Sequence, residues 1–264
     1  MCRSGAEFLI HSTAIIDPSA ELADDVIVGP FSVVGAGVRI DSGSILGSHV
    51  LVKGPTSIGK NNRIFQFSSV GEDTQDMKYR GEPTRLEIGD RNIIREYCTI
   101  HHGTVQDKWL TKIGNDNLLM AYTHVAHDCV VGNHVIMANA ASIAGHVLVE
   151  DFAILGGFTL VHQFCKIGRY SFSAMGSIIS RDIPPYVLVG GQPTKPHGIN
   201  AVGLERQGFS QDAIRQIKKA YKIVYKSGLK LEEAISTLEE MTGDTPEVES
   251  LVNFLKQTQR SILR

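Results

Sequence analysis

The sequence lacks three features that mark membrane, secreted or nucleic-acid-binding proteins. It has no run approaching the roughly 20 apolar residues that a membrane-spanning helix needs. Its N-terminus, MCRSGAEFLIHSTAIIDPSA, carries neither an apolar signal-peptide core nor a small-residue cleavage site. Lys and Arg number 26 against 28 Asp and Glu, so the basic excess used to bind phosphates is missing. We expect a soluble, cytoplasmic protein with no membrane span that binds no nucleic acid.

Cysteine is also scarce, whereas glycine is plentiful. The four cysteines have no Cys-x-x-Cys spacing, which supports neither a zinc ribbon nor a disulfide scaffold. The 26 glycines are about a tenth of the chain, above the usual ~7 %. The hydrophobic content of 42 % is enough for a core. These values indicate a folded chain with many tight turns.

An aliphatic residue recurs every six positions along most of the chain. One series runs from Ile16 to Val70, a short one from Ile88 to Ile100, and the last from Ile113 to Ile167. Most are followed, four positions later, by a small or β-branched residue. A period of six fits neither a helix nor a simple hairpin, but it fits a short strand followed by a sharp turn. Three such segments close one coil of a parallel β-solenoid, and the repeat predicts roughly eight coils stacked about 4.8 Å apart.

Two polar segments interrupt the period, and a different pattern follows it. Residues 71–87 and 101–112 are charged, so we expect them to leave the solenoid as surface loops. The repeat ends near residue 190, which predicts a solenoid over 1–190 and a linker with a helical domain over 191–264. The stretch PPYVLVGGQPTKPHG is typical of a linker. Ser210 suits the N-cap of an amphipathic helix, and two more helices are predicted over 231–241 and 248–262.

The repeat also predicts which way side chains face. The inward positions are the aliphatic residue and the residue four after it. Five of the ten histidines lie between residues 124 and 162, and none of them occupies an inward position. Three cysteines do: Cys98, Cys129 and Cys165. We therefore expect the histidines on the outside and the cysteines in the core, which disfavours a cysteine nucleophile.

One group of outward residues suits acyl transfer. Positions 18 apart stack in successive coils, so His127, His146 and His162 fall within one residue of a single column. Asp128 can orient the imidazole of His127 as a general base. The backbone N–H of Gly145, one coil on, can bind a developing oxyanion. A base, an orienting carboxylate and an oxyanion donor together are typical of an acyl-transfer site.

Several stretches resemble one family closely. They are FQFSSVGEDTQDMKYRGEPTRLEIGDRNIIRE, HHGTVQ, NLLMAYTHVAHDCVVGN, AGHV and VHQFCKIG. They resemble the UDP-N-acetylglucosamine O-acyltransferases of lipid A biosynthesis, which are hexapeptide-repeat acyltransferases. The resemblance spans nearly the whole chain. It implies a left-handed parallel β-helix, against the usual right-handed crossover preference, with a C-terminal α-helical domain and homotrimers that have active sites between subunits.

The resemblance also implies a reaction and a set of residues. An (R)-3-hydroxyacyl group would pass from acyl carrier protein to the 3-position of the sugar of UDP-N-acetylglucosamine, without cofactor or metal. His127 would be the base, Asp128 its orienting group and Gly145 the oxyanion donor. The implied substrate-binding residues are Gln75, Asp76 and Lys78 for the sugar, His124, His146, His162 and Gln163 for the donor and nucleotide, and Asn200 and Arg206 near the phosphates.

Three positions bear on specificity and partner binding. Val202 and Gln207 depart from the Glu and paired Arg that the family often has there. Met175 stands where relatives that accept longer chains have glycine, so we expect a donor of about ten rather than about fourteen carbons. The segment from Asp212 to Lys226 carries one acid, Asp212, and five cations, which favours docking of an acidic carrier protein; the cations are Arg215, Lys218, Lys219, Lys222 and Lys226.

The residues alone leave alternatives open. The same scaffold in the γ-class carbonic anhydrases binds zinc through three histidines, and a solenoid can also serve as a non-catalytic surface. Lys78 beside the histidines favours transfer over a zinc site. Whether the acceptor carries a 3-hydroxyl or a 3-amino group stays open, because both fit one groove.

Overall fold

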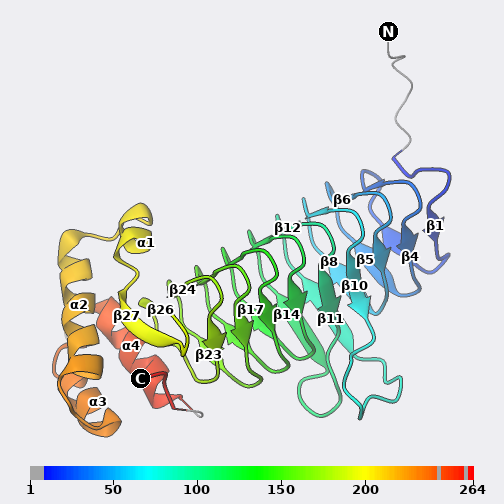
Figure 1. Cartoon of the computed structure of the whole chain (residues 1–264). Helices are drawn as coiled ribbons and strands as arrows, with labels where there is room; N and C mark the ends of the chain where they lie inside the picture. Colours follow the sequence, from blue (N-terminus) through cyan, green and yellow to red (C-terminus); the bar gives the residue numbers. More distant parts are fainter. Residues whose placement is uncertain (1–8, 243–244, 259–260) are drawn as a thin grey trace.

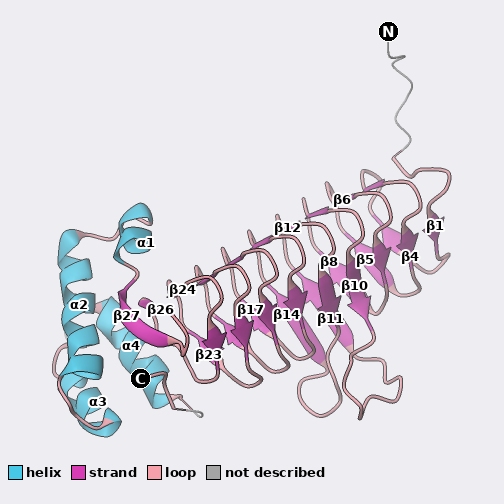
Figure 2. Ribbon diagram, viewed as in Figure 1, coloured by secondary structure: helices cyan, strands magenta, loops and turns pink. Residues whose placement is uncertain are grey.

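Three parallel β-sheets form the faces of a long three-sided prism, and a group of helices lies at its C-terminal end (Figure 1, Figure 2). The computed structural model describes residues 9–242, 245–258 and 261–264. From β1 to β25, each strand pairs in parallel with the strand three positions before or after it in chain order, so three successive strands make one coil. The face with the fewest described strands has eight, which agrees with the predicted number of coils.

The strands are short because a turn follows every hexad. The first face holds β1 (Ile15–Ile16), β4 (Val33–Val34), β7 (Leu51–Val52), β10 (Ser69–Glu72), β13 (Thr99–His101), β16 (His124–Val125), β19 (Ser142–Ile143), β22 (Leu160–Val161) and β25 (Ile178–Ile179). The second holds β2 (Glu21–Leu22), β5 (Val38–Ile40), β8 (Thr56–Ile58), β11 (Arg85–Ile88), β14 (Leu110–Ile113), β17 (Val130–Val131), β20 (Leu148–Val149) and β23 (Lys166–Ile167). The third holds β3 (Ile27–Val28), β6 (Ile45–Leu46), β9 (Arg63–Ile64), β12 (Ile93–Ile94), β15 (Leu118–Leu119), β18 (Ile136–Met137), β21 (Ile154–Leu155), β24 (Phe172–Ser173), β26 (Val187–Gly190) and β27 (Lys195–Ile199).

The core follows the predicted inward positions. Aliphatic residues of the hexads, such as Ile100 and Val125, are fully buried. Cys98, Cys129 and Cys165 are also fully buried, so their prediction as core residues is confirmed. Burial raises the pKa of the Cys129 thiol to about 12, so this thiol is not a nucleophile at neutral pH.

The corners of the prism require a left-handed backbone. The residue three after most hexad aliphatics has a φ near +60°, a region that costs a non-glycine residue about 1–2 kcal/mol. These residues include Phe31, His49, Phe67, Tyr97, Tyr122 and Phe158 at one corner, Asn61, Arg91, Asp116, His134, Phe152 and Tyr170 at the second, and Asp128, His146 and Phe164 at the third. Many of their rings stack from coil to coil, as His146 does on Phe164 with ring centroids 4.4 Å apart.

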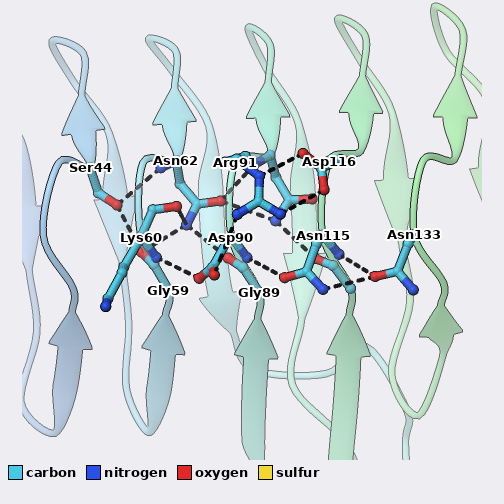
Figure 3. A network of polar contacts seen from close by, with 12 residues as sticks. Ser44, Gly59, Lys60, Asn62, Gly89, Asp90, Arg91, Asn115, Asp116 and Asn133 are labelled. Atoms are coloured by element: carbon cyan, nitrogen blue, oxygen red, sulfur yellow. Dashed lines mark hydrogen bonds and ion pairs between the residues drawn. The ribbon is translucent and has the colours of Figure 1, made fainter.

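Inside the second corner, buried asparagines form a ladder that the hydrophobic repeat does not predict (Figure 3). They occupy the inward position four after the aliphatic residue. Asn62 Oδ1 accepts hydrogen bonds from the backbone N–H and the side-chain amide of Asn92. Asn92 Oδ1 in turn accepts from the N–H of Asn117, and Asn117 Oδ1 accepts from the N–H of Val135. Each side chain therefore satisfies backbone groups of the neighbouring coil.

The C-terminal part corrects two of the expected boundaries. The stretch expected to be a linker forms β26 and β27, which pair antiparallel and close the prism, followed by the short helix α1 (Ala201–Arg206). Ser210 caps α2 (Gln211–Lys226) as predicted, by accepting a hydrogen bond from the N–H of Ala213. The next helices are α3 (Leu231–Glu239) and α4 (Pro246–Lys256). The last helix ends before the predicted residue 262 because the chain turns back and Ile262 pairs with Asp182; residues 259–260 lie outside the described residues.

The two interruptions leave the prism on the same side and follow β10 and β13. Strands extend into both, so the loops proper are residues 73–84 and 102–109. The second loop is not wholly a surface loop, as its first three residues, 102–104, are buried. None of the helices within the described residues is both long and apolar enough to cross a membrane.

Candidate active site

The imidazole of His127 is held at a corner of the prism by its neighbour in sequence. His127 lies in the turn that joins β16 to β17, and its Nδ1 is 2.9 Å from Oδ2 of Asp128. Asp128 is 2 % exposed. Burial acts to raise the pKa of its carboxyl, but hydrogen bonds from His127 and Thr104 outweigh burial and hold this pKa below its ordinary value. Asp128 is therefore a carboxylate at neutral pH, which favours the His127 tautomer with its proton on Nδ1.

Gly145 lies one coil further on, directly against the ring of His127. A Cβ atom at position 145 would overlap the ring of His127, at 2.5 Å from Cε1 and 2.7 Å from Nε2. Only glycine therefore leaves room for the imidazole. The ring of His146 meets that of His127 edge-on, with centroids 5.0 Å apart, and its Nδ1 is 2.9 Å from Oδ2 of Asp107.

Two cavities share His127 in their lining. The larger, of about 930 Å³, is polar and is lined by Asp76, Lys78, Gln106, Asp107, Lys108, His127, His146, Leu148, Gln163, Phe164 and Lys166. The smaller, of about 380 Å³, is more apolar and is lined by Gln75, Asp76, His101, His124, Ala126, His127, Ser142, Ile143, Ala144, Gly145, Leu160 and Val161. His127 and Asp76 border both. A nucleophile and an acyl group bound in separate cavities would thus meet at this imidazole.

The structure brings most of the predicted residues together around His127, and leaves some apart. The residues that line the two cavities with it are Gln75, Asp76, Lys78, His124, Gly145, His146 and Gln163. All five histidines between 124 and 162 lie outside the core, as the repeat predicts. His162 is exposed beside Gln163 and lines neither cavity.

The remaining predicted residues lie towards the C-terminal end. Met175 is 77 % exposed, so it is not a core residue. Asn200 caps α1, since its Oδ1 accepts from the N–H of Gly203 and its Nδ2 donates to the carbonyl of Tyr170. Arg206 is exposed in the last turn of the same helix, and Val202 is exposed in its first turn.

Three residues of this site were not identified from the sequence: His101, Thr104 and Asp107. His101 is 4 % exposed, and burial together with the neighbouring His124 lowers its pKa to about 4. Burial also lowers the pKa of His124, whose Nδ1 is 2.7 Å from the Thr99 hydroxyl. Both imidazoles are therefore neutral at pH 7. His101 directly follows the core aliphatic Ile100, at a position that the hexad period predicts to face outward. The period ends there because the second loop begins, and His101 is buried instead.

The same cluster offers a donor set for a metal ion. One donor atom from each of His127, Asp128 and His146 lies within 4.8 Å of the others. Nitrogen and carboxylate donors suit zinc. The Asp128 carboxylate, however, already accepts hydrogen bonds from Thr104, and Lys78 lines the same cavity. An ammonium group beside a metal cation is unfavourable. These three residues therefore suit a histidine oriented by a carboxylate better than a metal centre.

Fold and site together define the class of the protein. A prism of hexads with a histidine at its corner, oriented by a buried carboxylate, is typical of hexapeptide-repeat transferases, and the family model "Bacterial transferase hexapeptide (six repeats)" matches residues 110–145. A second model, "Udp N-acetylglucosamine O-acyltransferase; Domain 2", matches residues 182–263. The predicted left-handed parallel β-helix with a C-terminal helical region is confirmed.

Curated relatives narrow the class to one family. The chain is 58 % identical over 255 residues to the acyl-[acyl-carrier-protein]–UDP-N-acetylglucosamine O-acyltransferase of Saccharophagus degradans, covering 97 % of this chain and 99 % of the relative. It is 54 % identical to that of Stutzerimonas stutzeri, with the same coverage. The structure of LpxA from Acinetobacter baumannii superimposes with a TM-score of 0.95 at 52 % identity, covering 97 % and 100 % of the two chains. The chain belongs to the family of UDP-N-acetylglucosamine O-acyltransferases, which confirms the resemblance.

Proposed function

We propose that the chain transfers an (R)-3-hydroxyacyl group from acyl carrier protein to the 3-position of UDP-N-acetylglucosamine, the first step of lipid A biosynthesis. Relatives of 53–58 % identity over nearly the whole chain carry acyl carrier protein and this sugar nucleotide in their names. The observation that carries the mechanism is the position of His127, oriented by a buried carboxylate and bordering both cavities.

His127 acts as the general base. Its Nδ1 is occupied by Asp128, which leaves Nε2 to take the proton from the 3-hydroxyl of the sugar. The sugar oxygen attacks the thioester carbonyl, the C–S bond breaks, and the proton passes from His127 to the departing thiolate. Asp128 stays ionised and stabilises the imidazolium that forms between the two proton transfers. The N–H of Gly145, beside the imidazole, stabilises the oxyanion.

The remaining cavity residues divide by chemistry. Gln75, Asp76 and Lys78 belong to the first loop and offer hydrogen bonds and one positive charge to the sugar and its phosphates. His124, His146 and Gln163 line the cavity walls, where they contact the acyl donor and the nucleotide. His162, Asn200 and Arg206 belong to the same binding surface in this proposal, as they match family positions. A homotrimer would place a second subunit against the open side of each cavity, and no cofactor is required.

The test is an assay that offers both sugar nucleotides, with a 3-hydroxyl or a 3-amino group, and carrier proteins loaded with hydroxyacyl chains of graded length, with products identified by mass spectrometry. We expect His127→Ala to lower kcat by about 10²–10⁴-fold. His134→Ala is the matched control, because His134 lies in the next turn of the prism, between β17 and β18, but lines neither cavity. Parent-level transfer by His127→Ala would contradict the mechanism, and stoichiometric zinc in the pure protein would favour the hydration alternative.

A further inference from the structure

Thr104 makes three contacts with the carboxylate that orients the base. Its hydroxyl donates to Oδ2 of Asp128 at 2.6 Å, and its backbone N–H lies 3.0 Å from Oδ1 and 3.1 Å from Oδ2. The Oδ2 atom that accepts from the Thr104 hydroxyl is the same atom that faces Nδ1 of His127. Hydroxyl-to-carboxylate bonds of this length are among the stronger hydrogen bonds in proteins.

The contact is buried and comes from a distant part of the sequence. Thr104 is 1 % exposed and Asp128 is 2 % exposed, so water does not compete for these donors. The two residues are 24 positions apart, and Thr104 belongs to the loop that interrupts the repeat after β13. The backbone of Asp128 is fixed independently, since its N–H donates to the hydroxyl of Thr111 at 2.8 Å.

The loop is itself anchored immediately before Thr104. The hydroxyl of Thr84, at the end of the first loop, is 2.6 Å from the carbonyl of Gly103 and 2.8 Å from Nδ1 of His102. A Cβ at position 103 would stand 2.2 Å from the backbone nitrogen of Leu110, so the glycine permits the loop to close tightly on β14. His102 is 2 % exposed, and its Nε2 lies 3.4 Å from Asp73 at the start of the first loop. Both loops therefore hold Thr104 in place.

We infer that Thr104 is a positioning residue for the acyl transfer, the third member of a His127–Asp128–Thr104 chain in which it fixes the rotamer of Asp128 and shares its negative charge. This inference rests on the proposed function of His127 as the base. Without the hydroxyl, the carboxylate loses one of its donors and is freer to turn away from the imidazole. The orientation of the His127 imidazole toward the reacting hydroxyl then changes.

Thr104 and His127 share Oδ2 of Asp128, so removal of the hydroxyl changes the carboxylate that faces the imidazole. The other charged or titratable groups around this imidazole stay the same in the comparison. They are His124 on β16, His146 on the next coil, Asp76 and Lys78 from the first loop, and Asp107 and Lys108 from the second.

The experiment compares Thr104→Val, which keeps the β-branch and the N–H but removes the hydroxyl, with Thr104→Ser, which restores it. We expect Thr104→Val to lower kcat about 10- to 100-fold with both KM values within about twofold. Thr104→Ser should behave like the parent. Thr104→Ala serves in the same comparison if the valine variant does not fold.

Thr159→Val is the matched structural control. Thr159 is fully buried in the prism, and its hydroxyl is 2.9 Å from that of Ser173, away from Asp128. Thr159→Val should lower Tm without moving kcat. A Thr104→Val enzyme with parent kcat, while His127→Ala is inactive, would overturn the role of Thr104 alone. Parent activity in His127→Ala would instead overturn the proposed function.

Discussion

Gly145 shows how one residue can serve a site in two ways. Its N–H is the proposed oxyanion donor, and the absence of a side chain leaves room for the imidazole of His127. Alanine at this position would place a methyl group 2.5 Å from Cε1 of His127 and displace the base. Sequence reasoning identified the first role, whereas the second depends on a contact between coils that only the structure shows.

Met175 is the residue for which the acyl-length prediction is made. Its side chain is 77 % exposed, so it is available to end a groove on the surface. We expect the parent to prefer donors of about ten carbons and Met175→Gly to shift the preference to about fourteen, because glycine removes the thioether that blocks longer chains. Competition between carrier proteins loaded with the two chains, read by mass spectrometry, measures this.

Met175→Leu is the control for the acyl-length prediction. Leucine keeps most of the volume of methionine and should keep the shorter preference. A parent enzyme that prefers the fourteen-carbon donor would contradict the prediction, and so would a Met175→Gly enzyme with unchanged selectivity.

Among the elements, the asparagine ladder stabilises the second corner in a way that aliphatic packing does not. Asn92 bonds to Asn62, to the carbonyl of Gly114 and to the N–H of Asn117. We expect Asn92→Val to lower the free energy of unfolding by about 2–4 kcal/mol, because buried partners lose their hydrogen bonds. Denaturant titration measures the change. Asn139→Val, at an exposed position, should stay within about 0.5 kcal/mol of the parent. Equal stability of the two variants would show that the ladder is not stabilising.

The helix α2 carries the charges expected to attract the carrier protein. Its exposed face bears Arg215, Lys218, Lys219, Lys222 and Lys226. Reversing Lys218 and Lys219 to Glu should raise KM for the carrier and flatten its dependence on salt, because steering depends on screened charge. Kinetics at several ionic strengths measure both effects.

A charge-matched control separates docking from net charge. Reversing Lys60 and Lys112, two exposed lysines on the prism, changes the net charge equally but lies away from α2. If both double variants behave alike, or if the α2 variant has unchanged kinetics, this helix is not the docking site.

For the whole molecule, the exposed apolar surface supports the proposed homotrimer. Large rings follow one corner of the prism: Phe31 is 58 % exposed, Tyr122 61 % and Phe158 65 %. Contiguous apolar surface of this kind is typical of an interaction site. We expect light scattering to give a mass close to three times the 28.8 kDa of one chain. A double variant, Tyr97→Glu with Tyr122→Glu, should lower both the mass and the activity. A fully active monomer would contradict the proposal that sites lie between subunits.

The six-residue period carried most of the fold information. It predicted the coils, the inward cysteines and the outward histidines. Parallel pairing repeats every 18 residues within the uninterrupted coils, and this register fixes the side that each residue faces. It did not predict α1 or the pairing of β27 with β26, since proline and glycine in that stretch are equally typical of a linker.

What the sequence determined by itself is therefore the position of His127 outside the core of a rigid prism with Asp128 next to it, because a local period sets which side chains point inward. The tertiary structure decided how the two loops return to that surface. These loops have no period, so only their folded form brings Asp76 to the cavities and Thr104 to the carboxylate. The contact between Thr104 and Asp128 depends on burial and on anchors from both loops, and no local pattern encodes these.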